Sequence, residues 1–145
     1  MTGPRRAGLT GNYLVKAYEP ALDEVRDLLP NDRDFYLLRE HALKLRYWPE
    51  QNPEDENGRV LDLDWSYISN SDRIGELRIH ETIAGNDNLR VIFFVGEEDD
   101  RFPMKVIWIL MAFQKKRQDF SKAQKTTFQA RRKHVMTLLR RGLIR

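Results

Sequence analysis

The ten residues from Met104 to Phe113 constrain the fold more than any other segment of this 145-residue chain. Written as a strand they are apolar on both faces, which is typical of a strand inside a sheet rather than at its edge. The strand leads directly into three consecutive cations, Lys115, Lys116 and Arg117. Such an ending places fixed positive charge at the rim of a sheet, where a phosphate group can be bound.

The charge of the chain is divided unevenly along its length. Residues 114–145 hold eleven Lys or Arg and one acid, Asp119, so this tail carries about +10. The whole chain is only +3, so the first 113 residues carry about −7. This asymmetry favours a polyanionic partner at the basic end. A solvated helix face explains a basic run equally well, and the acidic part equally suits a basic protein partner.

Length and composition indicate one domain over residues 13–145 after a flexible lead-in at residues 1–12. The chain has no cysteine, which excludes disulfides, thiolate metal sites and a Cys nucleophile. No segment resembles a signal peptide or a membrane span. We therefore expect a cytoplasmic protein without membrane contact.

The first half of the chain predicts a strand followed by two helices. A β-rich run from Tyr13 to Tyr18 precedes Glu19-Pro20, where proline is harmless at a helix start, and Pro30 ends this first helix. Asn31 or Asp32 caps a second helix that Pro49 ends, so the two helices form a hairpin. A solvated loop is expected over residues 49–59, followed by a possible strand over residues 61–67.

The second half predicts a β-hairpin, the apolar strand and a basic helix. The runs from Ile74 to Ile83 and from Leu89 to Val95 are separated by a turn-forming segment. With Ile83 opposite Leu89, one face is apolar and buried, and the other carries polar residues. The last helix begins at Ser121 in a capping-box pattern with Gln124. The residues expected on the polar face are Glu76, Arg78, His80, Thr82 and Arg90.

Three segments in this order resemble the RelE/ParE toxin superfamily, and within it the HigB-type and related phage-derived toxins. The segments are Gly75-Glu-Leu-Arg-Ile79, Leu89-Arg-Val-Ile-Phe-Phe94 and Ile109-Leu-Met-Ala-Phe-Gln-Lys-Lys116. The likeness covers residues 74–117 best. Leu89 replaces the usual aromatic residue, and Phe120 lies where several members have a tyrosine or histidine for proton transfer.

The resemblance implies an α+β fold with a small antiparallel sheet in β-α-α-β-β-β-α order, an N-terminal helical hairpin and a basic C-terminal helix. It implies a type II toxin that cleaves messenger RNA in the ribosomal A site, and a cognate antitoxin that covers the basic surface. Its implied phosphate contacts are Arg78, Arg90, Lys115 and Lys116, and the candidate catalytic residues are Arg90, Lys115, Lys116 and His80. Further candidate RNA contacts in the basic tail are Arg117, Lys122 and Lys125. No cofactor or metal is expected.

Metal-free RNA cleavage needs a base that removes the 2′-hydroxyl proton, groups that stabilise the charge on the scissile phosphate, and an acid that protonates the leaving oxygen. His80 is the candidate base or acid because its ordinary pKa lies near 6.5. A half-exposed histidine beside Glu81 is the plainer interpretation, and Glu76 and Glu81 are the alternative proton acceptors. The strand arginines have a structural alternative in ion pairs with Glu76 and Glu81. Trp108 and Phe94 are expected in the core, with base stacking as their alternative.

Two other functions are compatible with the same fold, because fold alone does not decide function. One is a toxin of the ParE kind that binds DNA gyrase without cleaving RNA. The other is an inactive phage-derived module that binds RNA or protein through its basic helix.

Overall fold

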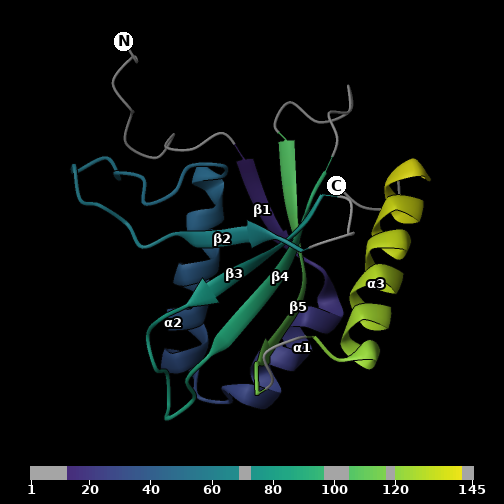
Figure 1. The fold of residues 1–145 in the computed structure, drawn as a ribbon, viewed down its shortest axis with the longest axis horizontal. Helices are drawn as coiled ribbons and strands as arrows, with labels where there is room; N and C mark the ends of the chain where they lie inside the picture. Colours follow the sequence, from purple (N-terminus) through teal and green to yellow (C-terminus); the bar gives the residue numbers. More distant parts are fainter. Residues whose placement is uncertain (1–12, 69–72, 97–104, 117–119, 142–145) are drawn as a thin grey trace.

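The protein has the expected α+β fold, but its single sheet has five strands, one more than the expected β-α-α-β-β-β-α order (Figure 1). The computed structural model describes residues 13–68, 73–96, 105–116 and 120–141, so the predicted lead-in at residues 1–12 lies outside it. The strand order is β1-β5-β4-β3-β2, and every pair is antiparallel except β1 with β5. The strands are β1 (Tyr13–Ala17), β2 (Asp64–Tyr67), β3 (Ile74–Ile79), β4 (Leu89–Val95) and β5 (Lys105–Gln114).

The helices begin and end where local chemistry predicts, with one exception. They are α1 (Glu19–Leu28), α2 (Asp32–Leu43) and α3 (Lys122–Arg140). The Asn31 side chain caps α2 by accepting from the Arg33 N–H, and the Ser121–Gln124 capping box opens α3. The exception is the end of α2, which gives way to the short 3-10 helix η1 (Lys44–Tyr47) before Pro49.

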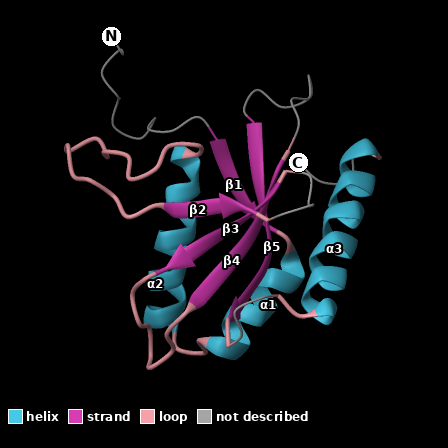
Figure 2. Ribbon diagram, viewed as in Figure 1, coloured by secondary structure: helices cyan, strands magenta, loops and turns pink. Residues whose placement is uncertain are grey.

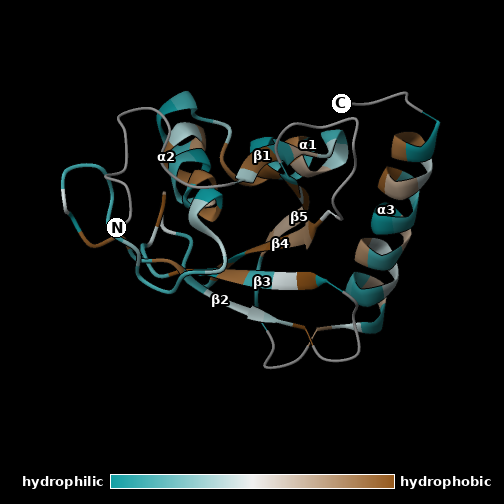
Figure 3. Cartoon of the chain, turned by 90° about the horizontal axis from the view of Figure 1, so that it is seen from above, coloured by the Kyte–Doolittle hydropathy of each residue, from teal (hydrophilic) through white to brown (hydrophobic). Residues whose placement is uncertain are grey.

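Two apolar clusters cover opposite faces of the sheet (Figures 2 and 3). On one face α1, α2 and η1 pack over Leu77, Val91 and Phe93. On the other face α3 packs Phe128 and Val135 against strand residues. These include the candidate stacking residues Phe94 and Trp108, which are buried in the core.

Strand β5 is an interior strand, as its apolar sequence predicts, and it contains a bulge. The register with β4 shifts between Ile92 and Phe93, so Ile92 pairs with Met111 whereas Phe93 pairs with Ile109. Leu110 and Met111 therefore both contribute to the cluster under α3. The bulge supplies the extra apolar side chain that α3 covers.

Strand β1 pairs only with the first half of β5, and polar contacts hold α3 against the second half, which has no strand partner on that side. The Arg131 guanidinium donates to the Leu110 carbonyl at 2.9 Å and to the Glu24 carboxylate at 2.8 Å. Glu24 in turn accepts from the Ala112 N–H at 3.3 Å. One ion pair from two helices thus satisfies an edge that β1 leaves unpaired. The Tyr18 hydroxyl also hydrogen-bonds His134 Nδ1 on α3.

The predicted hairpin register is wrong by four residues. Ile79, not Ile83, pairs with Leu89, and Ile83 instead makes an isolated bridge to Asn86 in the connecting turn. Because four is even, the same side chains still face the same sides of the sheet. The loop expected over residues 49–59 is a folded turn, in which the Asp55 carboxylate accepts from the N–H groups of Asn57 and Arg59.

Candidate functional site

The register of β2, β3 and β4 gathers charged residues on the face that α3 covers only in part. Asp64, Arg78 and Arg90 are cross-strand partners in one row, and Ser66 and Glu76 belong to the next row. Paired residues project to the same side of a sheet, so all five side chains share one face. In Figure 1 this face is turned toward the reader, with α3 standing beside it.

Glu76 is the centre of this cluster. Glu76 is only 7% exposed. Its carboxylate contacts cations from β3, from β4 and from the end of β5. Oε2 lies 3.1 Å from Arg90 Nε and 3.4 Å from Lys115 Nζ. Oε1 lies 3.4 Å from Arg78 Nη1. A buried carboxylate needs such compensation, and these cations supply it.

Asp64 organises the outer side of the cluster. It accepts a two-point contact from Arg78, with Nε at 3.0 Å and Nη2 at 2.8 Å, while Arg78 Nη1 also donates to Ser66. The Arg78 hydrogen bond holds the pKa of Asp64 below its ordinary value, and the same bond raises the pKa of Arg78. The second oxygen of Asp64 also contacts His80 Nε2 at 2.8 Å.

The candidate phosphate ligands therefore differ in availability. Each guanidinium nitrogen of Arg78 already donates a hydrogen bond, to Asp64, Ser66 or Glu76, which makes it a structural residue in this state. Arg90 uses Nε for Glu76 and Nη1 for the Leu89 carbonyl, so within the described residues its Nη2 makes no hydrogen bond. Lys115 lies 4.5 Å from the centre of the Phe120 ring and is half-buried. Arg90 and Lys115 are the cations best placed to reach an added anion.

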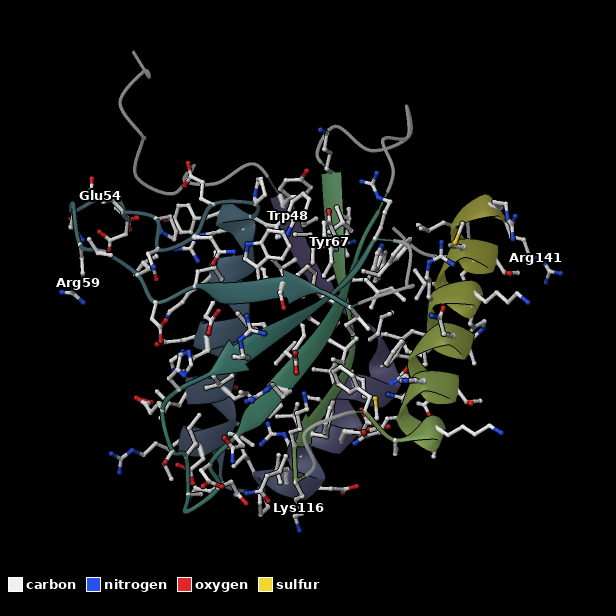
Figure 4. All side chains as sticks on the ribbon, in the orientation of Figure 1. Trp48, Glu54, Arg59, Tyr67, Lys116 and Arg141 are labelled. Atoms are coloured by element: carbon white, nitrogen blue, oxygen red, sulfur yellow. The ribbon has the colours of Figure 1, made fainter. Side chains whose placement is uncertain are left out.

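The other candidate RNA contacts lie around this cluster rather than in it. Lys116 is exposed and points away from the sheet (Figure 4). Lys122 and Lys125 are exposed near the start of α3. Arg117 lies outside the described residues. The two lysines after β5 thus point in different directions: Lys115 contacts Glu76, and Lys116 points away from the sheet.

The expected partners of the histidines and Glu81 are corrected by the structure. His80 pairs with Asp64 rather than resting beside Glu81, whose carboxylate instead lies 3.4 Å from His41 Nε2. Asp64 was missed as a site residue, although a signal existed in the sequence. Leu63, Trp65 and Tyr67 alternate as the apolar side of β2, so Asp64 and Ser66 must face the opposite side.

Comparison of the chain with protein-family models, with curated proteins and with solved structures finds no match. Among the described residues, no cluster of three or more His, Asp or Glu side chains is arranged to hold a metal ion. No described helix combines the length and the apolar character needed to cross a membrane.

Proposed function

We propose that this protein is a toxin of the RelE/HigB type, a ribosome-dependent endoribonuclease that cleaves messenger RNA and is neutralised by a cognate antitoxin. The proposal starts from the resemblance of residues 74–117. The observation that best supports it is the meeting of Arg90 and Lys115 around Glu76 on the polar sheet face. These two residues belong to two of the three segments that carry the resemblance.

In the proposed reaction the 2′-oxygen loses its proton to a base and attacks the neighbouring phosphorus. The bond from phosphorus to the 5′-oxygen breaks, which leaves a 2′,3′-cyclic phosphate and a 5′-hydroxyl whose proton comes from solvent water. Arg90 Nη2 and the Lys115 ammonium bind the phosphate oxygens and stabilise the charge that develops on them. Glu76 positions both cations before RNA binds, which reduces the reorganisation that binding requires.

His80 is the proposed base. Its Nε2 contacts Asp64, and if Nε2 carries the ring proton, Nδ1 has a free lone pair for the 2′-hydroxyl proton. The His80 side chain is 57% exposed, so RNA can approach it. The carboxylate of Asp64 then has the orienting role that carboxylates have in other acid–base sites.

The test is induced expression with mapping of messenger 5′ ends. The wild-type chain should arrest growth and produce new ends inside translated frames. The double variant Lys115→Ala, Lys116→Ala should be harmless while folding normally, and Arg33→Ala, at an exposed position on α2, is the matched control. Arrest with DNA damage and intact messages would support action on gyrase instead. Harmless expression and no cleavage on translating ribosomes would support a binding module without activity.

A further inference from the structure

A cavity of about 440 Å³ lies between α1 and α2, on the face of the sheet opposite the charged cluster. Val91, Ile109 and Ala112 form its floor, and Val25 and Leu38 belong to its two helical walls. Its volume is in the range of small-molecule sites. Both helices carry hydrophobic segments in Figure 3.

The cavity exists because small side chains meet there from four different elements. These are Ala17 of β1, Ala21 of α1, Ala42 of α2 and Ala112 of β5. Near the corner between the helices, Arg26 forms an ion pair with Asp32 at 2.6 Å and its guanidinium lies 3.8 Å from the centre of the Phe35 ring. These contacts fix the corner. Beyond it, apolar side chains that line the space remain exposed to water, Leu22 by 41%, and an apolar ligand would stabilise the protein by covering them.

The mouth of the cavity combines apolar side chains with a single cation. Leu22 and Tyr36 are 41% and 52% exposed at its rim. Arg39 is the one charged residue among those that line it. In the part of the chain that the structure describes, Arg39 has no ion-pair or hydrogen-bond partner. The site therefore offers an apolar interior with one free guanidinium at its entrance.

The lining favours a small ligand, because apolar side chains form the floor and walls and a single cation lies at the rim, which matches a molecule with one apolar part and one anionic group. We propose that the cavity binds a small amphiphilic monocarboxylate, with an unbranched alkyl chain between the helices and its carboxylate on Arg39. A carboxylate matches the planar fork of arginine in a two-point contact. This binding does not depend on RNA cleavage.

The test is calorimetric titration of the full chain with decanoate, supported by thermal unfolding with and without the ligand. We expect one saturable site and a higher unfolding temperature. Arg39→Gln should weaken decanoate binding by about tenfold, the loss typical of one charge-assisted contact, and should not change the binding of decanol. Arg33→Gln, also exposed on α2, is the matched control and should bind decanoate like the wild type.

Filling the cavity gives a second, independent variant. Ala17→Leu or Ala42→Leu, at lining positions that are not fully buried, should abolish binding of both decanoate and decanol. Because either variant can disturb packing, each is used only if its circular dichroism and unfolding cooperativity match the wild type, and Arg39→Gln decides if neither does. The proposal is overturned by an absence of saturable binding, by equal losses in Arg39→Gln and Arg33→Gln, or by a dimer of the chain that the cavity-filling variants dissociate.

Discussion

The carboxylate of Glu76 and the guanidinium of Arg90 lie 3.1 Å apart, although the two residues are diagonal neighbours rather than cross-strand partners. The residue directly opposite Arg90 is Arg78. Like charges opposite each other destabilise a sheet. Glu76 contacts both arginines and thereby makes their pairing tolerable.

Glu76→Gln should lower the free energy of unfolding by about 2 kcal/mol, because it leaves three clustered cations with one carboxylate fewer in a largely buried position. Urea denaturation measures this. Glu81→Gln is the control, since its side chain is 45% exposed and, among the described residues, its one ion pair is with His41. A Glu76→Gln protein as stable as the control would show that the cluster is not held by this carboxylate.

The stability contributed by Asp64 should depend on pH in the acid range. Its folded-state pKa lies below the ordinary value of 3.8, so the unfolded chain takes up its proton first as the pH falls. The contribution is therefore complete above 3.8 and disappears as the pH falls through the lowered value. The stability difference between wild type and Asp64→Asn should shrink on acidification in urea denaturation. A difference that does not change between neutral and strongly acid pH would contradict the Arg78 contact.

Gly75→Ala should destabilise the protein by more than about 2 kcal/mol, because the added Cβ would clash with the Phe93 ring on the neighbouring strand. Gly58→Ala is the comparison. Its φ of +77° disfavours alanine, but nothing lies near the added carbon, so the expected cost is about 1 kcal/mol. Thermal unfolding ranks the two, and Phe93→Leu in the Gly75→Ala background should recover part of the loss.

Arg131→Met should loosen α3 by removing its hydrogen bonds to Leu110 and Glu24, at a cost of about 1 to 2 kcal/mol. Hydrogen exchange of the α3 amides should become faster, while that of β3 and β4 changes less. Lys133→Met alters an exposed charge on the same helix and should leave exchange unchanged. Equal exchange in the two variants would mean that the Arg131 contacts do not hold α3.

The two lysines after β5 should separate in function. Lys115→Ala should weaken RNA binding and abolish cleavage, because its ammonium belongs to the Glu76 cluster. Lys116→Ala should retain most of both, because its side chain is exposed and turned away. Binding to single-stranded RNA at fixed salt and cleavage on translating ribosomes measure the two effects. The reverse order would place the phosphate site outside the sheet face.

Most of the secondary structure could be predicted from interactions between residues close in sequence. Pro30, the Asn31 cap and the Ser121–Gln124 capping box set helix boundaries through contacts within a few residues, which sequence alone can reveal. The hairpin register was misread because many registers with the same alternation of apolar residues bury the same face. The choice of Ile79 over Ile83 opposite Leu89 depends on the turn that Ile83 and Asn86 close.

By itself the sequence determined the α+β class, the interior position of β5 and the presence of cations on the polar face. These features depend on the spacing of apolar residues and on charge, which are local properties of the sequence. Only the tertiary structure decided which cations remain available. Asp64 and Arg78 are 14 residues apart, and Glu76 and Lys115 are 39 apart. The ion pairs between such residues arise from strand pairing. That pairing leaves Arg90 Nη2 unbonded within the described residues and engages every guanidinium nitrogen of Arg78, while Lys116 is exposed.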